Sequence, residues 1–287
     1  IRDSSLASIS RGEPLKSDNE MLQDSIIEQG ETLCLIIGNN SFQGFNNLNN
    51  TTNDSKNLRD ILASRYQTTI IYEENIAYVD YLEVLLKIKK NYQFEYGSQF
   101  LIYIASHGSK EGINGTQIIL TDSKRQKSGV LVNAQPVIQL QKFMNDISAT
   151  KTLLILDVCY SGDTYDYDFI KCEKLKLESE GTKFYNASPY SDIIKNTLTE
   201  ETNLCIASAS KNQTASDGIK GSNSPFSYLL IKYLKKYKKN IGDTYQLKNH
   251  LNKKNLRKLD AISDPVFITY GGHDLDPLDD NFLFIKK

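Results

Sequence analysis

Two residues that could form a catalytic pair each follow a strand-like apolar run. His107 comes after the run QFLIYIA and one serine, and Cys159 comes after TLLIL and two further residues. A thiol is mostly protonated near neutral pH, and an adjacent imidazole can take its proton to generate the nucleophilic thiolate. Glycines follow both residues, at Gly108 and Gly162, and permit tight turns and close approach of a substrate backbone. The pattern predicts nucleophilic catalysis with Cys159 as nucleophile and His107 as base.

The elements that would hold this pair alternate between short apolar runs and amphipathic helical stretches. Strands separated by helices favour an α/β fold with a mainly parallel sheet and helices on both faces. Ligands of such sheets gather beyond the carboxyl ends of the strands, so neighbouring strands would bring the thiol and the imidazole to one crevice. We expect strands at 33–37, 68–72, 99–105, 152–158 and 203–208, and helices at 54–65 (with Asn53 as N-cap), 78–90, 135–147 and 225–237.

A purely structural role for both residues is the alternative, with His107 as a loop histidine and Cys159 as a packed core thiol. Either residue alone would favour that interpretation. Both, however, follow clear apolar strands and precede small residues, and this paired placement favours catalysis. The backbone N–H groups of Gly108 and Cys159 would then form an oxyanion hole for the tetrahedral intermediate.

Composition excludes several other classes of protein. The chain of 287 residues is 39% hydrophobic, enough for a substantial core, and its net charge of −1 suggests neither a nucleic-acid nor a membrane partner. No apolar run approaches the length of a bilayer span, and the segment that begins at Ile1 has no signal-peptide core, so we expect a cytoplasmic protein and a truncated or cut chain. The four cysteines are too scattered for a disulfide scaffold or a zinc site: Cys34, Cys159, Cys172 and Cys205.

The sequences around the two residues resemble a known family. S-H-G after one strand and D-V-C-Y-S-G after the next long strand look like the caspases, the metacaspases and their prokaryotic relatives, and the D-x-C-x-S-G form is closest to the metacaspases and the bacterial proteins. The likeness extends over about residues 32–287 and includes SPFSYLLIKYL and DPVFITYGG. It implies a cysteine endopeptidase with the caspase-hemoglobinase fold and its sheet of about six strands. The implied parts are a lead-in at 1–31, a large-subunit part at 32–162, a linker at 163–202 and a small-subunit part at 203–287.

Substrate preference is argued from charge. Asp157 precedes Cys159 by two residues, so on an extended strand both side chains would point to one face, where a carboxylate attracts Arg or Lys at P1 and repels acidic residues. The resemblance implies an S1 pocket formed by Asp157 and Asp54, with Asp217 from the small-subunit side. Where metacaspases commonly have serine two positions before the histidine, this chain has Ala105. The bland alternatives are a helix-dipole charge for Asp54 and a buried structural hydrogen bond for Asp157.

The remaining expectations concern cofactors and partners. No cofactor is required, but several metacaspases use calcium, and three aspartates after the catalytic loop offer the oxygen ligands that this cation prefers. A solvated loop is the alternative for these aspartates. We expect a protein or peptide substrate and an upstream activator or sensor protein. A silent caspase-like scaffold or interaction domain is the second functional hypothesis, and a nucleotide-binding domain lacks the required glycine patterns. The candidate calcium ligands are Asp163, Asp166 and Asp168.

Overall fold

The computed structural model describes residues 26–110, 115–160, 197–210, 212–269 and 281–287. Within these ranges, no helix is both long enough and apolar enough to cross a membrane.

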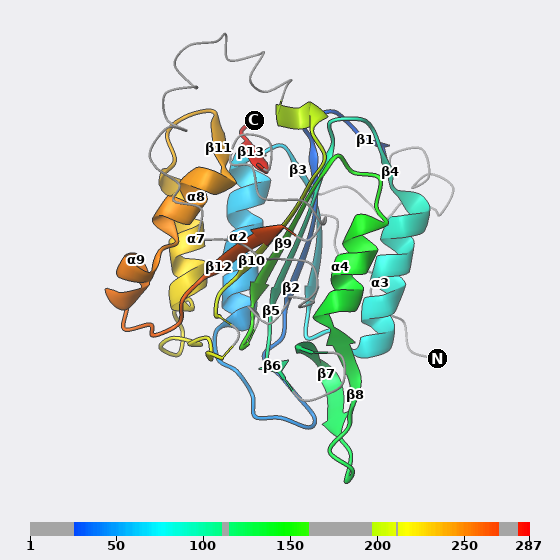
Figure 1. Cartoon of the computed structure of the whole chain (residues 1–287), viewed down its shortest axis with the longest axis vertical. Helices are drawn as coiled ribbons and strands as arrows, with labels where there is room; N and C mark the ends of the chain where they lie inside the picture. Colours follow the sequence, from blue (N-terminus) through cyan, green and yellow to red (C-terminus); the bar gives the residue numbers. More distant parts are fainter. Residues whose placement is uncertain (1–25, 111–114, 161–196, 211, 270–280) are drawn as a thin grey trace.

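A six-stranded sheet forms the centre of the molecule (Figure 1). Five of its strands run parallel, and the edge strand β12 runs antiparallel to its neighbour β10. The order β12-β10-β9-β5-β2-β3 makes β5 and β9 direct neighbours, as the predicted catalytic pair requires. The strands are β2 (Thr32–Gly38), β3 (Thr68–Glu74), β5 (Gln99–Ala105), β9 (Lys151–Asp157), β10 (Thr202–Ala207) and β12 (Val266–Thr269).

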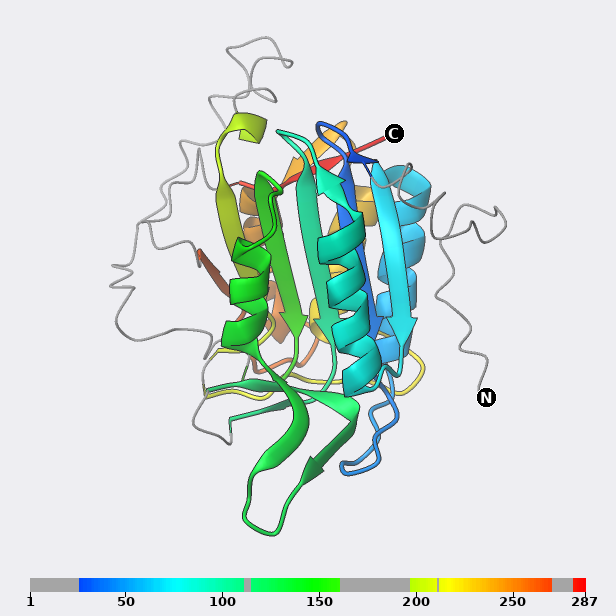
Figure 2. The same cartoon turned by 90° about the vertical axis from the view of Figure 1, so that its right-hand side faces the viewer.

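Helices cover both faces of this sheet, which confirms the predicted α/β architecture (Figures 1 and 2). Alternate residues of β2 belong to separate cores: Cys34 and Ile36 to one, Leu33 and Leu35 to the other. This alternation follows from the strand period of two, and it explains why the central strands are continuous apolar runs. One face carries α2 (Thr51–Arg65), α7 (Pro225–Lys236), α8 (Thr244–His250) and α9 (Lys253–Arg257), and the other carries α3 (Tyr78–Asn91) and α4 (Val137–Asn145).

In the part of the chain that the structure describes, three small sheets surround the central one. The largest projects beyond the carboxyl ends of the main strands as a long hairpin (Figure 2), which the pattern of apolar residues did not predict. It consists of β6 (Gly108–Ser109), β7 (Gln117–Arg125) and β8 (Leu131–Pro136). The other two pair β1 (Ile26–Ile27) with β4 (Gln93–Phe94) and β11 (Ile241–Asp243) with β13 (Leu283–Ile285).

The start of α2 differs from the prediction. The helix begins at Thr51 with Asn50 at the N-cap, and Asn53 lies inside its first turn, where its side chain donates to the carbonyl of Ser222 at 2.6 Å. The side chain of Asn50 makes no capping bond because it is engaged elsewhere, donating to the carbonyl of Ile219 at 2.9 Å. The prediction of Asn53 as N-cap was therefore wrong: long-range contacts, invisible in the local pattern, use both asparagines.

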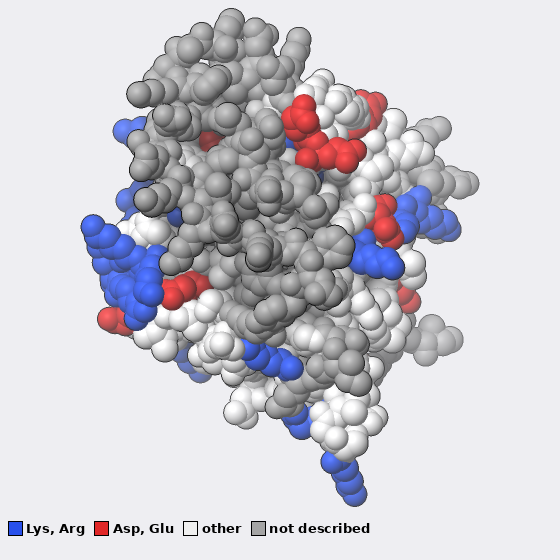
Figure 3. All heavy atoms as spheres, in the orientation of Figure 1, with Lys and Arg blue, Asp and Glu red and all other residues white. Residues whose placement is uncertain are grey.

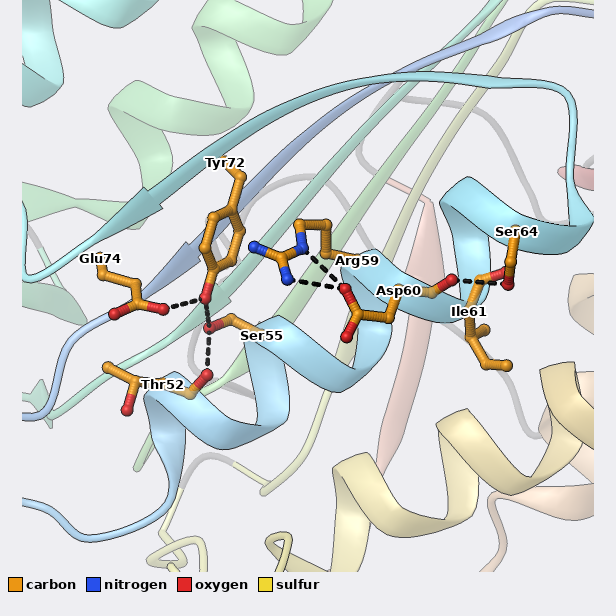
Figure 4. A network of polar contacts seen from close by, with 8 residues as sticks. All are labelled: Thr52, Ser55, Arg59, Asp60, Ile61, Ser64, Tyr72 and Glu74. Carbon is orange, nitrogen blue, oxygen red and sulfur yellow. Dashed lines mark hydrogen bonds and ion pairs between the residues drawn. The ribbon is translucent and has the colours of Figure 1, made fainter. Parts of the chain in front are cut away.

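Helix α2 is fixed against the sheet by close packing and a polar network (Figure 4). Gly38 ends β2 so near the helix that an added Cβ would lie 2.2 Å from the Ser55 hydroxyl oxygen. Ser55 also contacts the Tyr72 hydroxyl at 3.4 Å, and this hydroxyl in turn donates to Glu74. The guanidinium of Arg59 lies 4.4 Å from the centre of the Tyr72 ring, in cation–π geometry. These contacts set the position of the helix that carries Asp54.

Candidate active site

The carboxyl ends of β5 and β9 bring together the two segments that carry the predicted catalytic residues. Ala105 is the register partner of Asp157, and the amide of Ser106 donates to the Asp157 carbonyl at 3.3 Å. Two residues further, Gly108 packs on the backbone of Cys159: an added Cβ would lie 2.1 Å from the Cys159 carbonyl oxygen. The segment with His107 and the segment with Cys159 are therefore in direct backbone contact.

One nitrogen of His107 is held by the loop between β2 and α2. Its Nε2 lies 2.7 Å from the carbonyl oxygen of Asn46. A carbonyl can only accept, so Nε2 carries the proton and Nδ1 of the neutral ring is left as the acceptor. The rings of Phe42 and Phe45, with centroids 4.8 and 6.2 Å from that of the imidazole, flank it. The loop thus selects the tautomer with the proton on Nε2 and the acceptor on Nδ1.

Cys159 lies half-buried at the end of β9, with Sγ 3.8 Å from the carbonyl oxygen of Ala215. Burial raises the pKa of its thiol. Hydrogen bonding with the backbone of Ala215 and Gly108 lowers this pKa, and the charges of Asp157 and Asp217 raise it. The net direction is upward, so the thiol needs a base to become a nucleophile.

Asp54 and Asp157 are both buried and share one partner, Ser224. The amide of Ser224 donates to Asp54 Oδ1 at 3.0 Å, and its hydroxyl donates to Asp157 Oδ2 at 2.5 Å. The hydroxyl of Ser227 also donates to Asp157 Oδ2, at 2.8 Å. The side-chain amide of Asn223 donates to Asp54 Oδ1 at 2.7 Å. Ser224 is also the N-cap of α7, so the helix start and the two carboxylates form one unit.

Burial raises the pKa of both carboxyl groups and so disfavours the state in which both are ionised. Burial, followed by the charge of Asp157, raises the pKa of Asp54 from 3.8 to about 8. Burial also raises the pKa of Asp157, where the hydroxyls of Ser224 and Ser227 act in the opposite direction and Asp217 adds to the increase. A cation placed beside the pair would favour the charged forms, since opposite charges lower carboxyl pKa values.

Asp217 lies in the β10–α7 loop, near Asp54 and Asp157, and it also connects this loop to the start of α2. Its carboxylate accepts the amides of Asn49 at 2.7 Å and Asn50 at 3.1 Å, directly before α2. The Asn50 side chain completes the attachment through the carbonyls of Asp217 and Ile219 and the amide of Gly221. Its influence on the pKa values of Asp54 and Asp157 shows that the three acids share an electrostatic environment.

Several predictions fall on residues that the structure does not describe. The calcium candidates Asp163, Asp166 and Asp168 lie there, as does the predicted linker except for 197–202. Among the described residues, no group of three or more His, Cys, Asp or Glu side chains could hold a metal ion. The calcium site stays a prediction.

Sequence reasoning missed the polar residues that organise the acids. Tyr103 contributes a hydroxyl 2.6 Å from that of Ser227, deep under α7. The pattern S-P-x-S at 224–227 was a usable signal, because serine followed by proline marks a helix start and a second hydroxyl falls on the first turn. Asn46 and Asn50 gave no such signal, since their roles depend on loop conformation.

A search of curated proteins found no match for this chain. Residues 31–258, most of the chain, match the model of a peptidase family described as "Caspase domain". Together with the six-stranded sheet, this match establishes the family, which is a family of cysteine peptidases. The chain belongs to the caspase family.

Proposed function

We propose that the protein is a cysteine endopeptidase that cleaves after Arg or Lys, with Cys159 as nucleophile and His107 as general base. The observation that carries this proposal is that three groups lie together at the carboxyl ends of the central strands. The His107 segment abuts the Cys159 backbone, and the buried acids Asp54 and Asp157 lie where β9 ends.

The proposed reaction uses His107 twice. Nδ1 takes the thiol proton of Cys159, and the thiolate adds to the scissile carbonyl carbon. The N–H groups of Gly108 and Cys159 stabilise the resulting oxyanion. As the C–N bond breaks, the imidazolium returns its proton to the leaving amine, which leaves a thioester on Cys159. Water, deprotonated by the same imidazole, hydrolyses the thioester and restores the thiol. The Asn46 carbonyl holds Nε2–H throughout and stabilises the imidazolium.

The proposed P1 preference follows from the acidic cluster formed by Asp54, Asp157 and Asp217. A cation would stabilise the charged forms of two buried carboxyls whose pKa values are raised, and the guanidinium of Arg can engage two carboxylates at once. Arg is therefore expected to exceed Lys, and Gln, Leu and Asp at P1 are expected to be poor. Loss of a partner in a buried charge pair costs about 2–4 kcal/mol, the penalty expected for Asp157→Asn with an Arg substrate.

The test combines covalent labelling with a peptide panel. An acyloxymethyl ketone with Arg at P1 should alkylate Cys159, located by mass spectrometry, and neither Cys159→Ala nor His107→Ala should be labelled at that site or turn over substrate. Peptides that differ only at P1 (Arg, Lys, Gln, Leu, Asp) should rank as above on the wild type. Asp157→Asn should lose that ranking, and Asp260→Asn, an exposed residue, serves as the control.

Each part of the proposal has its own contradicting result. Turnover by Cys159→Ala would overturn the assignment of the nucleophile. A wild-type preference for Asp or Leu would overturn the pocket but not the catalytic pair. A folded wild type that neither cleaves any peptide nor takes the label would favour the silent scaffold.

A further inference from the structure

A glutamine behind the nucleophile connects the catalytic turn to the edge of the sheet. Tyr160, the residue after Cys159, has φ 59°, a left-handed conformation that non-glycine residues rarely adopt. Its amide donates to the main-chain carbonyl of Gln213 at 2.9 Å. This bond fixes the peptide plane between Cys159 and Tyr160, and with it the backbone of the nucleophile.

The side chain of Gln213 is in turn held at both ends by one residue. The backbone amide of Asp264 donates to Gln213 Oε1 at 2.7 Å, and Gln213 Nε2 donates to Asp264 Oδ2 at 3.3 Å. Asp264 lies two residues before β12. The pair therefore ties the β10–α7 loop, which also places Ala215 against the Cys159 thiol, to the sheet edge.

Cations of α9 hold Asp264 in this orientation. Lys253 Nζ lies 2.9 Å from Oδ2, and Arg257 Nη2 lies 3.9 Å from Oδ1. Lys and Arg atoms gather at the left edge of Figure 3, where Figure 1 places α9. Both cations are about half exposed, with side-chain exposures of 59% and 47%, so the ion pairs are expected to contribute less than the Gln213 hydrogen bonds.

We propose that Gln213 is a positioning residue for the peptidase reaction: clamped by Asp264, it holds the Cys159–Tyr160 turn in its left-handed conformation and so aims the nucleophile. The inference rests on the proposed function. Gln213 touches neither substrate nor the reacting atoms in this role. Its loss is expected to lower kcat and to leave the KM for an Arg substrate nearly unchanged, because the acidic cluster keeps its own contacts.

The polarity of the clamp allows a rescue experiment. Gln213→Glu retains the acceptor for the Asp264 amide but replaces the donor with a carboxylate that faces Asp264. Misplacement of a reacting group costs up to about 100-fold, so kcat is expected to fall by about 10- to 100-fold. Adding Asp264→Asn provides a new donor to the introduced carboxylate, reverses the polarity of the bond and should restore kcat to within about threefold of wild type. Asp264→Asn alone can still accept from Gln213 and should lose less than about threefold.

The measurements separate positioning from general destabilisation. Gln126→Glu, in an exposed turn of the hairpin, and Asp260→Asn are controls with the same chemical changes. Steady-state kinetics give kcat and KM, and hydrogen exchange reports the Tyr160 amide, which should exchange faster in Gln213→Glu and recover in the double variant. If Gln213→Glu fails to fold, Gln213→Met keeps the volume without the bonds and should show the same loss of kcat.

Unchanged kcat in Gln213→Glu, or no recovery in the double variant, would overturn the inference. If the wild type has no turnover, the proposed function fails, but the clamp is still judged by the exchange of the Tyr160 amide and the rate at which iodoacetamide alkylates Cys159. Failure of the rescue on those two measures would overturn it independently of activity.

Discussion

The reactivity proposed for Cys159 and His107 depends on the backbone groups around them. Burial raises the pKa of the Cys159 thiol, so the proposed mechanism relies on His107 as a base and not on a preformed thiolate. The Asn46 carbonyl fixes the proton on Nε2, and this frees Nδ1 for that task. Gly108 matters because it has no side chain: its Cα sits on the Cys159 backbone. Each of these effects belongs to a single residue and can be tested singly.

Gly108→Ala should inactivate the protein without unfolding it. The new Cβ would lie 2.1 Å from the Cys159 carbonyl oxygen and 3.2 Å from its nitrogen, and backbone atoms cannot rotate away. The strand ends must separate, which displaces the proposed oxyanion donors, so we expect kcat to fall by about 100-fold or more. The control is Gly129→Ala, where the new Cβ meets no atom within 4 Å but φ is +85°; it introduces backbone strain in the hairpin turn, away from the site, and should keep its activity. Wild-type kcat in a folded Gly108→Ala would contradict the oxyanion assignment.

At the scale of elements, the helix starts rather than the strands organise the acidic cluster. The first turn of α2 supplies Asp54, and the N-cap of α7 supplies Ser224, which bridges Asp54 and Asp157. The approach of α2 to the sheet depends on Gly38 at the end of β2. A small change at this contact should therefore act on both stability and substrate binding.

Gly38→Ala should destabilise the fold and weaken the binding of Arg substrates. The added Cβ would lie 2.2 Å from Ser55 Oγ and 2.6 Å from the Thr51 carbonyl, and such overpacking costs about 1–3 kcal/mol. Moving the first turn of α2 also moves Asp54, so KM should rise. Urea unfolding and steady-state kinetics measure the two effects. Combining it with Ser55→Ala should recover only part of the stability, because the Thr51 carbonyl remains; full recovery would show that the backbone contact is unimportant.

At the scale of the whole molecule, the buried acids connect folding to pH. The pKa of Asp54 is about 8 in the folded chain and near 3.8 when solvated. Between these values the folded state binds one proton more than the unfolded state, so this group makes stability fall as pH rises. The loss begins near pH 4 and is complete above pH 8. Bound Arg would act in the opposite direction by stabilising the ionised form.

Asp54→Asn should flatten the dependence of stability on pH. Asparagine can still accept the Ser224 amide and the Asn223 side chain, but it does not titrate. The wild type should lose up to about 1.4 kcal/mol per pH unit more than the variant between about pH 5 and 8. Urea unfolding at several pH values gives both curves, and Asp260→Asn should follow the wild type. Parallel curves for wild type and Asp54→Asn would contradict the raised pKa.

The pattern of apolar residues was enough to predict five of the six central strands and the helices α2, α3, α4 and α7, but not the edge strand β12. Strand 99–105 was predicted with its observed bounds, and the other predicted strands agree to within two residues, because buried strands must be continuous apolar runs. The ends of those strands then indicated His107 and Cys159 as the candidate pair. The same local reasoning placed Asp54 on the first turn of a helix and Asp157 at a strand end.

What those residues contact is settled only when the chain has folded. The Asn46 carbonyl on His107, the sharing of Ser224 by two acids and the Gln213–Asp264 clamp join segments up to 170 residues apart. Local periodicity carries no record of such contacts, since it reflects only which face of an element is buried. The wrong N-cap at Asn53 has the same cause: both asparagines near the start of α2 bind the β10–α7 loop, and that partner comes within reach only through the tertiary fold.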